Sequence, residues 1–169
     1  MEKKAKITFY GGTGTVTGSN FLLEIDDKKI LIDCGLTQGI KLADDINWDP
    51  FHYRPEEIDF LFISHAHVDH LGRVPKLIYE GFKGQIYSTK PTKALAPFML
   101  EDTAGILSKN KDFDLDKIYS AENINSAISK WTGFEYQESI KLTPNLEVSF
   151  LNAGHILGSA MVCFIYNGN

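Results

Sequence analysis

The chain has 169 residues, enough for one domain with a sizeable hydrophobic core. Hydrophobic residues make up 43% and charged residues 23% of the chain, which is ordinary for a soluble globular protein. The net charge of -5 argues against broad electrostatic attraction to nucleic acid, since such binding needs Lys and Arg side chains to neutralise phosphates.

No stretch approaches the roughly 18 to 20 apolar residues that a membrane span requires, and the start, MEKKAKITFYGG, lacks the apolar core of a signal peptide. We therefore expect a cytoplasmic protein without membrane contact. Cys34 and Cys163 lie far apart and form no CxxC pair, so we expect reduced, partly buried thiols and no disulfide framework.

The first third of the chain predicts a β meander. Asp26-Asp27 marks a hairpin between the second and third of three runs that are rich in β-branched and aromatic residues: KITFY, SNFLLEID and KKILIDCG. After a loop that contains Pro50 and Pro55, the run EEIDFLFIS is almost continuously apolar, which is typical of a strand buried on both faces.

Helical patterns follow. VPKLIYEGF predicts a short helix with Pro75 in its first turn, and GQIYST predicts a return to strand. Apolar spacing predicts an amphipathic helix from Thr92 to about Lys109, interrupted near its start by Pro97, and a second helix over about Ala121 to Trp131.

The last part, SIKLTPNLEVSFLNAGHILGSAMVCFIYNGN, predicts a strand, a Pro-Asn turn, a strand, a glycine-containing loop and a strand. Strands that alternate with helices behind a meander indicate an α/β sandwich, in which helices cover buried sheet faces.

Metal-ligand residues are concentrated in SHAHVDHLGR, residues 64–73, directly after the predicted buried strand. A catalytic zinc usually has three protein ligands, chosen from imidazole, thiolate and carboxylate groups, with water in the open position. A tight loop after the strand lets His65 and His67 point to one side while Asp69 and His70 reach a second point, which favours two adjacent metals over one. The alternative is a surface loop that happens to contain histidines, but three of them with an aspartate at the end of a buried strand favour a metal site.

Only two histidines lie outside this cluster, His52 and His155. His155 lies in NAGHILGSA, a glycine-flanked loop after a predicted strand, and is the better candidate for a third ligand. We expect His52, in FHYRP, to be an ordinary rim or packing residue.

The motif HAHVDH followed by Leu71-Gly72 resembles the HxHxDH signature of the metallo-β-lactamase superfamily, whose fold is an αββα sandwich with metals held by loops along one sheet edge. Other segments, in order across nearly the whole chain, resemble the β-CASP family of RNA-processing nucleases. They are GGTGTVTGSNFLLE, ILIDCG, EEIDFLFISHAHVDHLGRVPKL, GFKGQIYSTKPT and AGHILGSAMV.

The resemblance implies a role for each candidate residue. Asp33, in IDCG, would be the first-motif aspartate that orients the site from behind the ligands, whereas its alternative role is to cap a turn at a strand end. His65, His67 and His155 would hold the first zinc, and Asp69 with His70 would begin the second site. The family completes that second site with a bridging aspartate and a later histidine, which this sequence lacks.

The resemblance therefore implies that residues 1–169 form the N-terminal, incomplete part of a metallo-β-lactamase-like domain, without its second half and without a β-CASP domain. The implied function is a zinc-dependent hydrolase domain from a nuclease that cleaves RNA by a two-metal hydroxide mechanism, with Asp69 accepting or orienting the proton of the nucleophile. For this chain alone we expect about one tightly bound zinc, negligible phosphodiesterase activity, and possible self-association through the uncovered sheet.

Two other functions are considered. One is a small-molecule hydrolase of thioesters or lactones that uses the same metals, and the other is a non-catalytic interaction module. The segment GGTGTVTG has neither the G-x-G-x-x-G order nor the ending of a phosphate-binding loop, so we interpret it as a tight glycine turn, which by the resemblance borders the metal cleft.

Overall fold

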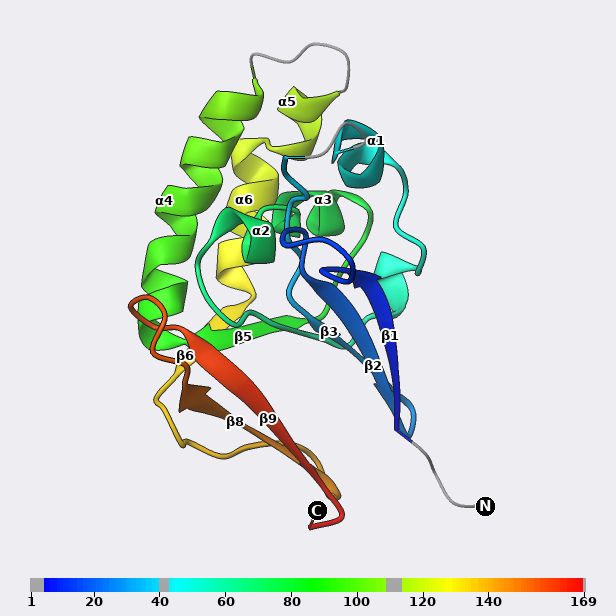
Figure 1. The fold of residues 1–169 in the computed structure, drawn as a ribbon, viewed down its shortest axis with the longest axis vertical. Helices are drawn as coiled ribbons and strands as arrows, with labels where there is room; N and C mark the ends of the chain where they lie inside the picture. Colours follow the sequence, from blue (N-terminus) through cyan, green and yellow to red (C-terminus); the bar gives the residue numbers. More distant parts are fainter. Residues whose placement is uncertain (1–4, 40–42, 109–113, 169) are drawn as a thin grey trace.

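The computed structural model describes residues 5–39, 43–108 and 114–168, which form two β-sheets and a group of helices (Figure 1). The larger sheet has the strand order β1-β2-β3-β4-β5-β6 and the smaller has the order β7-β8-β9. The nine strands are β1 (Lys6–Gly11), β2 (Asn20–Ile25), β3 (Lys28–Ile32), β4 (Phe60–Phe62), β5 (Gln85–Thr89), β6 (Trp131–Phe134), β7 (Ile140–Thr143), β8 (Leu146–Asn152) and β9 (Ala160–Tyr166). The predicted N-terminal meander and the three predicted C-terminal strands are confirmed.

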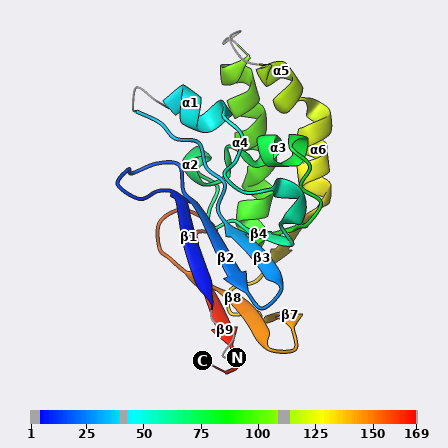
Figure 2. The same cartoon turned by 90° about the vertical axis from the view of Figure 1, so that its right-hand side faces the viewer.

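The helices gather at one end of the molecule in both views, with the strands at the other (Figures 1 and 2). They are α1 (Ala43–Trp48), the 3-10 turn η1 (Pro55–Glu57), α2 (Val68–Leu71), α3 (Val74–Tyr79), α4 (Lys90–Leu107), α5 (Leu115–Ile118) and α6 (Ala121–Ser129). No helix in the described ranges is long and apolar enough to cross a membrane.

Strand direction in the larger sheet changes at β3. The pairs β1–β2 and β2–β3 are antiparallel, whereas β3–β4, β4–β5 and β5–β6 are parallel. The register places Ile32 beside Phe62 and Phe62 beside Tyr87. The residues that follow these three strands therefore meet at one edge of the sheet, where parallel sheets characteristically place functional side chains.

Two hydrophobic cores cover the two faces of the larger sheet. On the helix side, Leu61 and Ile86 pack in one cluster with Leu77 of α3, Leu100 of α4 and Ala127 of α6. Because successive strand residues point to opposite faces, Phe62, which follows Leu61, points into the other core.

The second core lies between the two sheets. Phe62 is fully buried there, with its ring centroid 5.9 Å from that of Phe150 and 5.5 Å from that of Phe164. The order of layers is thus helices, six-stranded sheet and three-stranded sheet, which is the first part of the predicted αββα sandwich. Met161 and Ile165 are 56% and 42% exposed, so the outer face of the smaller sheet is open in the described part of the chain.

Several predicted boundaries are wrong. The predicted strand over residues 56–64 shortens to β4, because Pro55 starts a 3-10 turn whose closing hydrogen bond comes from Ile58 N. Trp131, predicted to end a helix, begins β6 instead, where its indole N–H reaches Ser88 Oγ at 2.8 Å. The long helix runs from Lys90 to Leu107, and its predicted end at Lys109 lies outside the described residues.

Candidate metal centre

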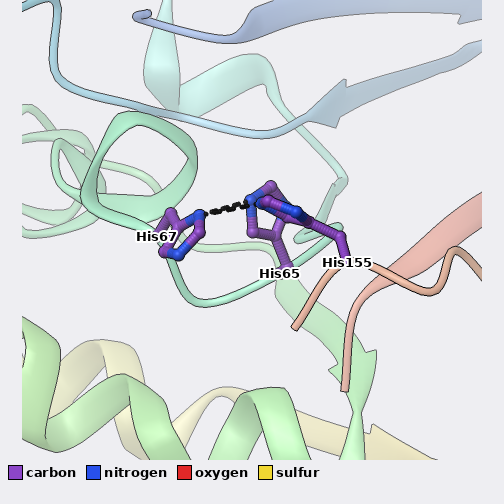
Figure 3. Close-up of side chains that lie close together, drawn as sticks. All are labelled: His65, His67 and His155. Atoms are coloured by element: carbon purple, nitrogen blue, oxygen red, sulfur yellow. Dashed lines mark hydrogen bonds between the residues drawn. The ribbon is translucent and has the colours of Figure 1, made fainter. Parts of the chain in front are cut away.

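Three of the five histidines meet where β4, α2 and the β8–β9 loop come together. His65 follows β4, His67 precedes α2, and His155 comes from the other sheet, 88 positions further along the chain than His67. One ring nitrogen from each lies within 4.8 Å of the other two. Figure 3 shows His67 facing the other two rings. We call His65, His67 and His155 the three-histidine group.

The nitrogen separations in this group suit one small cation. His67 Nδ1 lies 3.1 Å from His65 Nε2 and 3.2 Å from His155 Nε2. In a tetrahedral site with zinc–nitrogen bonds of about 2.0–2.1 Å, neighbouring ligands lie roughly 3.3 Å apart. A neutral imidazole nitrogen is either one donor or one acceptor, so a single Nδ1 cannot form two good hydrogen bonds. A cation would instead accept lone pairs from all three nitrogens.

The rings differ in their exposure to solvent. His65 is buried, His67 is partly exposed and His155 is exposed. Burial, with a smaller contribution from the charge of His70, lowers the pKa of His65 to about 4. His65 is therefore neutral near pH 7, and a neutral imidazole is the form that binds a metal.

Asp69 and His70 lie beside this group without joining it. The ring centroids of His65 and His70 are 3.8 Å apart, and His70 Nε2 is 3.6 Å from Asp69 Oδ2. Burial opposes charge on His70, but the hydrogen bond and negative charge of Asp33, aided by Asp69, outweigh it and raise the pKa of His70. Asp69 and His70 thus form a second pair of groups that could bind a metal, next to the three-histidine group.

Asp33 lies behind the histidines, with only 3% of its surface exposed. Its Oδ1 accepts a hydrogen bond from Ser64 N at 2.8 Å, and its Oδ2 accepts from Ser64 Oγ at 2.9 Å and from Ser19 Oγ at 3.0 Å. The same Oδ2 lies 2.7 Å from His70 Nδ1, which fixes a proton on that nitrogen and leaves Nε2 available as a ligand. The backbone of Asp33 has a φ of 60°, in the left-handed region that few non-glycine residues adopt.

Ser64 connects the carboxylate to the first histidine, and sequence reasoning had treated it only as the end of a strand. Its Oγ lies 3.0 Å from His65 Nδ1 and donates to Asp33 Oδ2. When His65 Nε2 serves as the ligand, its Nδ1–H can donate to Ser64 Oγ, and this chain orients the ring. A serine before a histidine carries no pattern that predicts this role.

Backbone hydrogen bonds hold residues 65–70, which we call the histidine loop, against the two segments that contain Ser19 and Cys34. Cys34 N donates to His70 O at 2.7 Å and Ser19 N donates to Asp69 O at 2.9 Å. This approach requires glycine at position 35, because a Cβ atom there would lie 1.6 Å from Asp69 O. The glycine turn before Ser19 therefore ends beside the histidine loop.

The remaining predicted residues lie elsewhere. His52 stacks on Tyr10, with centroids 6.2 Å apart, and lines a cavity of about 180 Å³ that also contains Arg73. Cys34 is fully buried, and burial raises the pKa of its thiol to about 11. His52 is exposed at this cavity, whereas Cys34 belongs to the core on the helix side of the larger sheet.

Two curated proteins are similar in sequence to nearly the whole of this chain. A ribonuclease of Thermus thermophilus, TTHA0252, is 36% identical over 93% of this chain and 34% of its own length. The transcription termination factor FttA of Methanosarcina mazei is 35% identical over 94% of this chain and 25% of its own length. The chain thus spans between a quarter and about a third of the length of these curated relatives.

Structural and family comparisons point the same way. The crystal structure of the metallo-beta-lactamase fold protein YhfI from Bacillus subtilis matches this chain with a TM-score of 0.56. The match covers 99% of this chain and 59% of the YhfI chain at 16% identity, so it shows a likeness of fold. The sequence profile of the metallo-beta-lactamase superfamily domain matches residues 22–168. The chain therefore belongs to the metallo-β-lactamase superfamily.

Proposed function

We propose that the chain is the metal-binding part of a hydrolase that cleaves phosphodiester bonds in RNA, with zinc as the metal. The observation that carries the proposal is the convergence of His65, His67 and His155 on one point at the sheet edge. The relatives named as a ribonuclease and as a transcription termination factor support RNA as the substrate class.

Each residue has a distinct part in the proposed mechanism. The three-histidine group would hold the first zinc, and Asp69 with His70 would contribute two ligands to a second. Bound zinc would supply a hydroxide at neutral pH and neutralise charge on the attacked phosphate. Asp69 would accept or orient the proton of the attacking water. Asp33 would hold His70 by its Nδ1 and His65 through Ser64.

Zinc content tests the first part of the proposal. After dialysis against zinc-free buffer, we expect about one tightly held zinc per chain, because three histidines make a complete protein ligand set and an Asp–His pair does not. His155→Ala should lower the zinc affinity at least tenfold, whereas His52→Ala, a control outside the group, should bind zinc as the wild type does. Equal affinities in the two variants would remove His155 from the site.

Cleavage assays test the substrate class. On the full translation product of the gene, we expect zinc-dependent cleavage of single-stranded RNA and little hydrolysis of thioesters or lactones. The opposite preference would favour the small-molecule hydrolase. We further propose that residues 1–169 alone cleave RNA negligibly, since they offer two ligands for the second metal, and rapid cleavage by this polypeptide would contradict that.

Self-association is the remaining part of the proposal. The outer face of the smaller sheet exposes Met161 and Ile165, and apolar surface of this kind favours pairing with a second copy. Sedimentation velocity of the 169-residue chain should detect a dimer whose fraction rises with concentration. A monomer that persists at high concentration would contradict this part alone.

A further inference from the structure

The His155 loop, residues 153–159, is exposed at its tip and buried at its end. His155 and Leu157 are exposed, and Leu157 retains 71% of its surface. Gly158 and Ser159 are buried, and Ser159 is only 1% exposed. A loop with few buried contacts at its tip relies on its anchored end for a fixed conformation.

Hydrogen bonds within the loop fix its local shape. Ser159 Oγ accepts from His155 N at 3.0 Å and from Ile156 N at 3.2 Å, and Ser159 N donates to Ile156 O at 2.9 Å. These bonds make the loop compact, but they do not fix where it lies relative to the other two histidines. That position depends on contacts outside the loop.

One outside contact comes from two threonines at the junction of β5 and α4. Thr89 ends β5 and caps α4, Thr92 lies in the first turn of α4, and both are buried, at 1% and 0% exposed. Thr89 Oγ1 lies 2.6 Å and Thr92 Oγ1 lies 2.9 Å from the carbonyl oxygen of Gly158. Figure 1 shows the loop between β8 and β9 beside the start of α4. We call Thr89 and Thr92 the threonine pair.

The two hydroxyls also lie within hydrogen-bond distance of each other. Thr89 Oγ1 can give its single proton either to Gly158 O or to Thr92 Oγ1, which is 3.0 Å away. Thr92 Oγ1 can likewise donate to Gly158 O or to Thr89 Oγ1. Each hydroxyl is within hydrogen-bond distance of Gly158 O, so the carbonyl accepts from one or both of them, and a hydroxyl that does not donate to it can donate to the other.

Gly158 is shaped for this contact. Its φ is 84°, and a Cβ atom at this position would lie 2.6 Å from Thr92 N. A side chain would thus push the loop away from α4. A buried carbonyl that met no donor would also be costly, because it loses its bonds to water.

We infer that Thr89 and Thr92 are positioning residues for His155, which fix the third ring against His65 and His67 through the Gly158 carbonyl. The inference rests on the proposed metal-binding role of His155 and adds residues that touch neither metal nor substrate. Thr89 ends a strand of the larger sheet and Thr92 lies in the first turn of α4, so the position of a ligand from the smaller sheet would be set by the junction of β5 and α4. Supporting residues of this kind typically change metal affinity by about 10- to 100-fold.

The test compares three single variants. Thr92→Val removes the hydroxyl at nearly constant volume, and Thr92→Ser restores it. Thr103→Val is the matched control, because Thr103 is also buried on α4 and donates to a backbone carbonyl, that of Met99 at 2.6 Å, away from Gly158. The double variant Thr89→Val/Thr92→Val removes both donors.

Two measurements are made on each variant. Zinc affinity, from competition with a chelating dye, should fall about tenfold in Thr92→Val and further in the double variant, and should return to within threefold of wild type in Thr92→Ser. Amide hydrogen exchange of residues 153–159 in metal-free protein should quicken in Thr92→Val and stay unchanged in Thr103→Val.

The outcomes separate the inference from the proposed function. Unchanged zinc affinity and unchanged loop exchange in the double variant overturn the inference, as does an equal loss of affinity in Thr103→Val. If Thr92→Val quickens exchange in the loop but neither the wild type nor any variant binds zinc, the threonine pair anchors the loop. Its role in supporting a metal ligand is then overturned, together with the proposed function.

Discussion

Asp33 offers the sharpest test of how the site is organised, through the isosteric change Asp33→Asn. The asparagine oxygen can still accept from Ser64 N, but its amide nitrogen would replace the oxygen that now faces Ser19, Ser64 and His70. Serine hydroxyls can turn to accept a hydrogen bond. The imidazole of His70 cannot do so unless its proton moves from Nδ1 to Nε2.

The substitution therefore has two consequences. His70 Nε2 loses the lone pair that it would offer beside Asp69, and Ser64 loses the carboxylate to which its hydroxyl donates while it supports His65. Removing a partner of this kind typically lowers metal affinity 10- to 100-fold, or about 1.4–2.7 kcal/mol. Loss of one charge-assisted hydrogen bond at a buried carboxylate should also lower the free energy of unfolding by about 2 kcal/mol.

The assay is zinc competition with a chelating dye, combined with urea unfolding of the metal-free protein. Asp102→Asn makes the same change of charge at an exposed position of α4 and should alter neither quantity. A folded Asp33→Asn variant whose zinc affinity stays within twofold of wild type would refute the reasoning, because Asp33 would then serve only the turn after β3.

Three further predictions concern packing and thiol chemistry. Phe62→Ala should lower the free energy of unfolding by about 3–5 kcal/mol in urea titration, because Phe62 is fully buried between the sheets. Gly35→Ala should destabilise the protein by about 3 kcal/mol, since its Cβ would lie 1.6 Å from the backbone oxygen of Asp69. The control Gly105→Ala lies in α4, where an added Cβ would meet nothing within 4 Å, and should stabilise the protein by about 0.5–1 kcal/mol in the same assay. Ellman's reagent at pH 8 should titrate Cys163 in the native protein and reach Cys34 only on unfolding, because burial raises the pKa of the Cys34 thiol to about 11; rapid reaction of two thiols in the native state would contradict this.

The predicted elements that matched share one property: their signals are local. The hairpin at Asp26-Asp27, the C-terminal strands around a Pro-Asn turn, and the amphipathic period of α4 are each encoded within a few consecutive residues. Errors arose where a local pattern had two solutions. The apolar run before Ser64 predicted a long strand, but Pro55 starts a 3-10 turn within it. The pattern around Trp131 predicted the end of a helix, but Trp131 pairs with β5 as a strand residue.

The candidate site divides in the same way. The sequence by itself determined the cluster His65, His67, Asp69 and His70, because all four lie in one short loop after a buried strand. It also determined His155 as the better of two remaining candidates.

Only the tertiary structure decided that His155 meets the cluster, that Ser64 links His65 to Asp33, and that Thr89 and Thr92 contact the loop of the third histidine. These contacts join segments far apart in the chain, and they form because two sheets stack through Phe62 and a helix packs at the edge where their loops meet. Short sequence patterns specify strands and turns, whereas the distance between two loops depends on how the layers pack.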